Sequence, residues 1–308
     1  MVSNFQKTIK EPIEFEGVGL HNGAKVKLCL KPAEINSGIK FKRTDIDSDK
    51  NIIDATYKNV ISPILCTKIK NSYNVSVSTI EHLMAVFYGE GIDNVLVEVN
   101  ESEIPIMDGS AFDFATAIRS FGVVEQNAEK KFIKVLKKVE LKDGPKYISI
   151  EPLSKDLIID FEIVYKNPLI RTRRKEFKLS SGNLDSIYNS KTFCLYEDID
   201  KIKTQGLAKG GSLENAIVVR DNKILNEDGL RYRDEFVNHK ILDCLGDLML
   251  CEHRLFGHIK VSQGGHQLTN ALLRKFLTEK SNWEFESFKG KEKDNKDNTY
   301  LRPVAASA

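Results

Sequence analysis

Alternating apolar and polar residues predict strands along the first third of the chain. Residues 25–30 alternate strictly, as a strand with one buried face does. The pair Asn22-Gly23 before them favours a tight hairpin turn, so this strand is expected to pair with the preceding one. The expected strands are residues 5–16, 25–30, 39–43 and 95–99.

Apolar residues at helical spacing predict helices at residues 75–88 and 111–121. Ser78 and Glu81 have the spacing of a capping box at the start of the first helix. A glycine follows each helix, where the backbone can take up the left-handed conformation that often ends helices. This part of the chain therefore has the order hairpin, strand, helix, strand, helix.

The same order of elements returns after a polar segment at residues 125–131, where we place a domain boundary. The later strands are expected at residues 132–141, 146–150, 157–165 and 259–261, and the later helices at 233–252 and 269–279. We infer two copies of one α+β module, an N-terminal domain at residues 1–126 and a C-terminal domain at residues 131–308.

Three segments stand outside this repeat. Residues 191–212 form an insertion before the long helix of the second half, and such insertions often carry function. The basic run at residues 171–175 is expected to be an exposed loop, and the charged residues 289–298 a solvated surface loop.

Composition excludes several classes of protein. The 308 residues include 46 Lys and Arg against 44 Asp and Glu, and a net charge of +2 disfavours a dedicated nucleic-acid-binding protein. Residues 1–10 lack the apolar core of a secretory signal, and no apolar run approaches the ~20 residues that span a bilayer. Five scattered cysteines without a C-x-x-C pair indicate reduced thiols in a cytoplasm, and they argue against a thiolate zinc site.

One histidine and one carboxylate on the long helix have the spacing of metal ligands. His239 and Asp243 are four residues apart, so they share a helix face and could bind one ion or simply hydrogen-bond to each other. Glu81 and His82 lie on the equivalent helix of the first half, where the alternatives are a helix cap and a buried histidine. Because a pseudo-twofold axis would bring the two helices together, we expect these four residues to form one site.

Two histidines and one carboxylate leave a fourth tetrahedral position open, as catalytic zinc sites do. A neighbouring carboxylate can then take a proton from an attacking water, which is the chemistry of metal-assisted amide or ester hydrolysis. His266 follows Gly264-Gly265 and could be a general acid or an ordinary loop histidine. Asp247 continues the acidic face of the long helix and could be merely solvated.

The other candidate groups stay open at this level. His253 and His258 flank an expected turn and are taken as surface residues, while His21, in the glycine-rich hairpin, could be structural or functional. Cys66 could approach the metal or be a small buried filler.

Ten segments in a constant order resemble one enzyme family. They are residues 17–23 (GVGLHNG), 77–82 (VSTIEH), 91–94 (GIDN), 103–111 (EIPIMDGSA), 191–193 (KTF), 210–212 (GGS), 216–219 (AIVV), 225–230 (LNEDGL), 234–237 (DEFV) and 239–243 (HKILD). The chain is identified on these motifs as a member of the UDP-3-O-acyl-N-acetylglucosamine deacetylase family, which catalyses the committed step of lipid A synthesis in Gram-negative bacteria. The resemblance extends from about residue 8 to about residue 285.

The resemblance implies a fold and a metal. The fold is two similar α+β domains, each a sheet with two helices, forming a β-α-α-β sandwich with the helices packed between the sheets. His82, His239 and Asp243 would bind one Zn²⁺ ion, for which Fe²⁺ could compete in vivo.

The resemblance also implies roles around the ion. Glu81 would be the general base, and His266 the acid that stabilises the oxyanion and protonates the leaving amine. Thr192 would donate a hydrogen bond to the tetrahedral intermediate, and Asp247 would orient His266.

The expected substrate is a small UDP-linked acyl sugar. Phe193 would pack on the sugar, Lys240 would pair with the diphosphate, and the insertion would form an apolar tunnel for the acyl chain. The expected tunnel residues are Leu20, Ile199, Ala208 and Leu213. We expect a cytoplasmic monomer that binds no nucleic acid and does not insert stably into a membrane, although the fatty chain allows weak interfacial contact.

This chain departs from the family pattern at a few positions, and two rival functions remain. Lys191 and Cys194 replace a common Arg and Gly, and Gly264 replaces a Ser beside the expected acid. A non-catalytic binding protein of the same fold predicts damage to the four site residues, which are intact. A structural metal site predicts a fourth protein ligand, for which His21 and Cys66 are the candidates.

Overall fold

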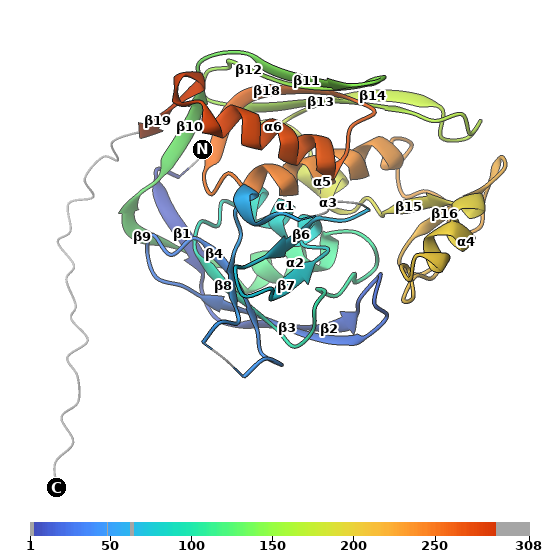
Figure 1. The fold of residues 1–308 in the computed structure, drawn as a ribbon, viewed down its shortest axis with the longest axis horizontal. Coiled ribbons are helices and arrows are strands. Elements are labelled where there is room, and N and C mark those ends of the chain that lie inside the picture. Colours follow the sequence, from blue (N-terminus) through green and yellow to red (C-terminus); the bar gives the residue numbers. More distant parts are fainter. Residues whose placement is uncertain (1–2, 48, 62–64, 288–308) are drawn as a thin grey trace, which may run out of the picture.

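The computed structural model describes residues 3–47, 49–61 and 65–287 (Figure 1). The elements of its first half are the strands β1 (Phe5–Ile9), β2 (Ile13–Val18), β3 (Lys25–Pro32), β4 (Ile39–Arg43), β5 (Ile52–Asp54), β6 (Lys68–Lys70), β7 (Ser76–Ser78), β8 (Val95–Val99) and β9 (Val123–Glu129), the helices α1 (Glu81–Glu90) and α2 (Phe112–Phe121), and the 3-10 helix η1 (Tyr57–Asn59).

The second half contains further strands and four more α-helices. They are β10 (Lys131–Val135), β11 (Val139–Asp143), β12 (Lys146–Glu151), β13 (Leu157–Val164), β14 (Thr172–Lys178), β15 (Phe193–Leu195), β16 (Ile217–Arg220), β17 (Lys223–Ile224), β18 (Arg254–Ser262) and β19 (Trp283–Ser287), with α3 (Leu184–Tyr188), α4 (Tyr196–Thr204), α5 (Glu235–Met249), α6 (His266–Thr278) and the 3-10 helix η2 (Lys280–Asn282).

The two large sheets have the same strand order. In the first sheet the order is β2-β3-β8-β4-β5, and the only parallel pair is β8 with β4. In the second sheet β11, β12, β18, β13 and β14 follow one another in the same way, with β18 parallel to β13, and the sheet continues from β18 to a second parallel neighbour, β10. The chain is therefore two copies of one α+β module, which confirms the prediction from the order of elements.

A flanking strand pair repeats as well. β1 pairs antiparallel with β9, and β10 pairs antiparallel with β19, so each module begins and ends with the two strands of one pair. Because β9 ends at Glu129 and β10 begins at Lys131, we propose that the domain boundary lies between these two residues. The sequence analysis ended the first domain at residue 126 and began the second at residue 131.

The helices α1, α2, α5 and α6 lie between the two large sheets (Figure 1). All residues of α1 from Glu81 to Tyr88 are buried, as are nearly all of α5, which explains why neither helix has a polar face turned to solvent. The two helices cross closely at Gly246 of α5, where an added methyl group would lie 2.0 Å from the carbonyl oxygen of Glu81. Only glycine permits this approach.

Two expected elements are divided in the structure. Residues 5–16 form β1 and β2, with a break before Ile13, and residues 132–141 form β10 and β11. The expected helix at 75–88 begins only at Glu81, because Ser76–Ser78 pairs with Lys68–Lys70 as β7. The prediction of a capping box was wrong, because the Ser78 hydroxyl donates to the Ser102 carbonyl at 3.2 Å and does not cap the helix.

The basic run at residues 171–175 was expected to be a loop, but all of it except Arg171 lies in the edge strand β14. Arg174 forms an ion pair with Asp160 on β13 at 2.5 Å, and Lys175 donates to Asn238 at 2.6 Å. Charged side chains are frequent on exposed sheet edges because they oppose pairing with another chain. His258 lies within β18, not beside a turn, and the expected loop at 289–298 is outside the described residues.

Within the described ranges no helix is long and apolar enough to cross a membrane.

The crossing at Gly246 makes a first prediction. Gly246→Ala adds a methyl group against the Glu81 carbonyl, and the clash outweighs the better helix propensity of Ala, so we expect a loss of about 1–3 kcal/mol in unfolding free energy. Denaturant unfolding measures this change. Thr116→Ala, at an exposed position of α2, is the control and should leave stability unchanged or slightly raised; an equal response of both variants would contradict the close packing of α1 and α5.

Candidate metal centre and adjoining cavities

Three ligand-type side chains meet where α1 crosses α5. His82 comes from the first turn of α1, and His239 and Asp243 come from successive turns of α5. One ligand atom from each lies within 4.8 Å of the others, and all three residues are buried. Oδ1 of Asp243 is 3.6 Å from Nε2 of His82 and 3.4 Å from Nε2 of His239, so the three donors converge on one point.

The surroundings keep these donors ready for a cation. Nδ1 of His239 donates to the Ser190 carbonyl at 3.0 Å, which leaves Nε2 facing the cluster. Burial lowers the pKa of His239 to about 3, so the ring stays neutral. Burial alone would raise the pKa of Asp243, but His239 and Lys240 hold it well below its usual value. Two imidazoles and a carboxylate fit a zinc-type ion and leave a coordination position open.

Glu81 lies directly beside the cluster. Its carboxylate is buried and accepts a hydrogen bond from the Thr67 backbone N–H at 3.0 Å. Burial raises its pKa, although the nearby His266 and His82 oppose the shift. Nε2 of His266 is 3.7 Å from Oε1 of Glu81, so an acid and a base face each other across a short gap. A raised carboxylate pKa suits a group that must accept a proton near neutral pH.

His266 begins α6 and is oriented by two groups. Its Nδ1–H donates to Oδ2 of Asp247 at 2.8 Å and lies 3.1 Å from the Thr67 hydroxyl, which itself donates to the other oxygen of Asp247 at 2.6 Å. Burial alone would lower the pKa of His266, but the carboxylates of Asp247 and Glu81 raise it to about 10. The imidazole is therefore protonated and can donate a proton from Nε2.

A cavity of about 610 Å³ opens beside these groups. Thr192, Phe193, Lys240 and His266 all contribute to its walls. The Phe193 ring packs edge-on against Phe236 at 4.8 Å, which holds it at the cavity wall. Nζ of Lys240 lies 5.7 Å from the centre of the Phe193 ring and donates to Oδ2 of Asp243 at 2.9 Å. The expected diphosphate partner is thus tied to a metal ligand.

A second cavity, of about 370 Å³, adjoins the first and shares Thr192 and Phe193 with it. Its walls are mainly apolar, and they include all the residues expected for the tunnel, namely Leu20, Ile199, Ala208 and Leu213. The ring of His21 is buried at this cavity, and within the described chain neither of its nitrogens has a hydrogen-bond partner.

The insertion forms much of this second cavity. The insertion is longer than the expected residues 191–212, because it continues to β17, which ends at Ile224. β15, β16 and β17 make a small sheet with α4 against it, at the side of the molecule (Figure 1). The glycines of the insertion pack against the hairpin loop of the first module, where the N–H of Gly210 donates to the Leu20 carbonyl at 3.0 Å. A methyl group on Gly210 would lie 2.3 Å from the Gly19 carbonyl oxygen, so the two glycine motifs are complementary surfaces.

Three supporting residues escaped the sequence analysis. Thr67 contacts Glu81, Asp247 and His266 at once, and Ser190 orients His239 through its carbonyl. Glu103 accepts from the N–H groups of His21 and Asn22 and from the Thr79 hydroxyl. Thr67 is next to Cys66, which the sequence analysis considered, and Glu103 is the first residue of a family motif. The pattern of apolar and polar residues did not predict the contacts of either side chain.

Cys66 lies near the site without joining the ligand cluster of the described residues. Cys66 is buried, and burial raises the pKa of its thiol to about 12. The nearby charge of Glu81 acts in the same direction. The place of Cys66 outside the cluster fits a small buried filler.

A second acidic cluster does not match this arrangement. Asp160, Glu176 and His258 lie near one another on the second sheet, but Asp160 already pairs with Arg174 through both oxygens. Its carboxylate is thus occupied by a cation of the protein.

The comparisons with known proteins agree with this site. Residues 6–278 match the family model described as UDP-3-O-acyl N-acetylglycosamine deacetylase. The chain is 43% identical over 291 residues to the UDP-3-O-acyl-N-acetylglucosamine deacetylase of Actinobacillus succinogenes, covering 94% of this chain and 95% of that protein. It is 44% identical over 287 residues to the enzyme of the same name from Shewanella pealeana, covering 92% and 93%. The chain therefore belongs to the UDP-3-O-acyl N-acetylglycosamine deacetylase family.

Proposed function

We propose that this protein is a zinc-dependent deacetylase. It hydrolyses the 2-acetamido group of UDP-3-O-(3-hydroxyacyl)-N-acetylglucosamine to a free amine and acetate, the committed step of lipid A synthesis. The observation that carries the proposal is the Glu81–His266 pair beside the cluster of His82, His239 and Asp243. The names of the related enzymes from Actinobacillus succinogenes and Shewanella pealeana support the substrate.

The side chains around the metal centre contribute proton transfer and charge stabilisation to the proposed reaction. His82, His239 and Asp243 would hold a zinc ion, which would supply a Lewis acid for the amide carbonyl and the attacking water. Glu81 accepts a proton from the water as its oxygen attacks the carbonyl carbon. His266 stabilises the oxyanion and then gives its Nε2 proton to the leaving amine as the C–N bond breaks.

Other side chains hold the substrate in place. Thr192 donates to the oxyanion, and Asp247 keeps His266 protonated and oriented, which its 2.8 Å hydrogen bond supports. Phe193 packs on the sugar, and Lys240 pairs with the diphosphate from the wall of the larger cavity. The acyl chain occupies the apolar cavity, between Leu20 and the insertion residues Ile199, Ala208 and Leu213.

The setting follows from the substrate. We propose a monomer that acts in the cytoplasm on a small anionic molecule, with only weak contact between the enzyme and a membrane surface. The near-zero net charge fits this assignment, because individual cations such as Lys240 bind the substrate without an extended basic surface. Zinc is the proposed metal, and iron is its competitor at a site of this donor type.

Replacement of the general base tests the mechanism. Glu81→Gln keeps the size of the side chain but removes the proton acceptor, so we expect kcat for acetate release to fall by about 10²–10⁴-fold. Metal content and substrate Kd should stay near the wild-type values. Glu14→Gln, at an exposed position on β2, is the control and should keep full activity. Near wild-type kcat in Glu81→Gln would show that another group takes the proton.

Removal of the metal tests the cofactor. Dialysis against a chelator should abolish acetate release, and one equivalent of Zn²⁺ per chain should restore it, because the described donors hold a single ion. His239→Ala should lose the tightly bound ion, whereas His253→Ala, outside the cluster, should retain it. Elemental analysis of each variant measures this. Full activity in metal-free enzyme would contradict the proposed function.

The apolar cavity makes a prediction about chain length. Ile199→Trp fills part of the cavity, so kcat/KM should fall at least tenfold for long 3-O-acyl substrates and little for short ones. Turnover across a series of acyl lengths measures the change. Lys201→Trp, at an exposed position of the same helix, should leave the length profile unchanged. A uniform loss at every length in Ile199→Trp would place the acyl chain elsewhere.

A further inference from the structure

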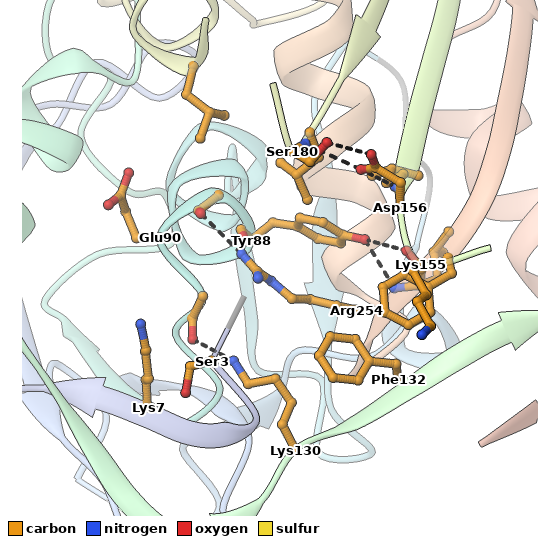
Figure 2. A pocket seen from close by; sticks show the side chains of 17 residues that line it. Ser3, Lys7, Tyr88, Glu90, Lys130, Phe132, Lys155, Asp156, Ser180 and Arg254 are labelled. Carbon is orange, nitrogen blue, oxygen red and sulfur yellow. Dashed lines mark hydrogen bonds between the residues drawn. The ribbon is translucent and has the colours of Figure 1, made fainter. Parts of the chain in front are cut away.

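A separate cavity of about 390 Å³ lies between the two modules (Figure 2). Its walls come from β1, the C-terminal end of α1, and the beginnings of β10, β13 and β18. The metal cluster involves the other end of α1, which is 10 residues and therefore about 15 Å long. This cavity is thus distinct from the site described above, although the same helix reaches both.

A buried arginine lines this cavity, and its hydrogen bonds do not use all of its guanidinium donors. Arg254 is 9% exposed, and its Nη2 donates to the carbonyl oxygens of Tyr88 and Gly89 at the end of α1. Its guanidinium lies 5.4 Å from the centre of the Tyr88 ring (Figure 2). Its Nε is also buried, and among the described residues it has no hydrogen-bond partner. The helix-capping role of Arg254 accounts for Nη2 but leaves Nε unsatisfied.

A buried lysine adds a second positive charge. Lys130 is 2% exposed, and its Nζ donates to the Gly91 carbonyl at 3.0 Å and pairs with Asp93 at 2.8 Å. Burial lowers the pKa of Lys130 to about 8, and the charge of Arg254 acts in the same direction, against the effect of Asp93. An ammonium group with three donors still has one to offer after these two contacts.

The carboxylates at the wall have other cations to balance them. Glu90 pairs with Arg119 at 2.8 Å, and Asp156 lies 3.6 Å from Lys178. Within the described part of the chain, Arg254 forms no ion pair with a carboxylate. Lys7 brings a further cation to the wall. The cavity therefore has an excess of positive charge, which a buried site balances with an anion.

The remaining wall is aromatic and apolar. Phe132 and Phe256 stack on each other with ring centres 4.7 Å apart, and Leu157 lies beside them. The volume is in the range of cavities that hold small ligands and exceeds what a bare phosphate ion would fill. The ligand should therefore combine an anionic group with a compact apolar body.

We propose that this cavity binds a small phosphate monoester whose apolar body lies against the aromatic wall. Its phosphoryl oxygens accept hydrogen bonds from the guanidinium of Arg254 and from the ammonium groups of Lys130 and Lys7. A dianionic phosphoryl group matches several converging cations better than a single carboxylate does. Because Arg254 and Lys7 belong to different modules, the ligand holds the end of α1 between them.

Binding of phenyl phosphate to the full-length, metal-loaded protein tests the proposal. Titration calorimetry at constant ionic strength should give saturable binding, tighter than that of inorganic phosphate. The Tm should rise by about 2–3 °C at ten times the Kd, because the ligand binds the folded state. Arg254→Gln and Lys7→Met should each weaken binding about tenfold or more. The lysine variant keeps the test valid if loss of the α1 cap unfolds the arginine variant.

Two control variants locate the binding. Lys10→Met changes an exposed lysine near the end of β1 and should bind phenyl phosphate as the wild type does. Lys240→Met changes the cation beside the metal cluster and should also leave this binding intact. Absence of binding to the wild type would overturn the proposal. So would binding that Lys240→Met abolishes and Lys7→Met leaves unchanged, since the phosphate would then occupy the metal-site cavity.

Discussion

The close crossing of α1 and α5 is the constraint on which the rest of the structure depends. The crossing is possible because Gly246 has no side chain where α5 meets the Glu81 carbonyl. It brings the rings of His82 and His239 to 4.9 Å between centres, one from each module. Neither module holds all three candidate ligands alone, so the proposed metal site forms only when the two modules pack together. Metal binding there would therefore be coupled to the packing of the two modules.

Burying so many ionisable groups is costly unless each has a partner. These groups find their partners in a hydrogen-bond network in which Thr67 contacts Glu81, Asp247 and His266. Asp247 supplies the charge that keeps His266 protonated, and Lys240 supplies one that keeps Asp243 ionised. The same buried environment thus raises the pKa of Glu81 and of His266 but lowers that of His239, because burial and the neighbouring charges act differently on each group.

Much of the site could be predicted from the sequence, and the reason is the repeat. Once the order of elements indicated two equal modules, His82 and His239 fell on equivalent helices, and the structure brings them together. The family motifs pointed to the residues that form the cavity walls. The positions of Thr67 and Ser190 could not be predicted, because their partners are distant in sequence and act partly through backbone atoms.

The sequence by itself determined the order of elements, the paired glycine motifs and the set of residues able to bind a metal, since these follow from local periodicity and side-chain chemistry. Only the tertiary structure decided which local signal prevailed. Ser78 could cap a helix, but Ser76–Ser78 forms a strand instead, and the Ser78 N–H donates to the Ser102 carbonyl while its own carbonyl accepts from Ile104. The basic run around Arg174 resembled a loop, yet β13 provides hydrogen bonds and Asp160 provides charge. Long-range hydrogen bonds override local preference because every buried backbone group must find a partner.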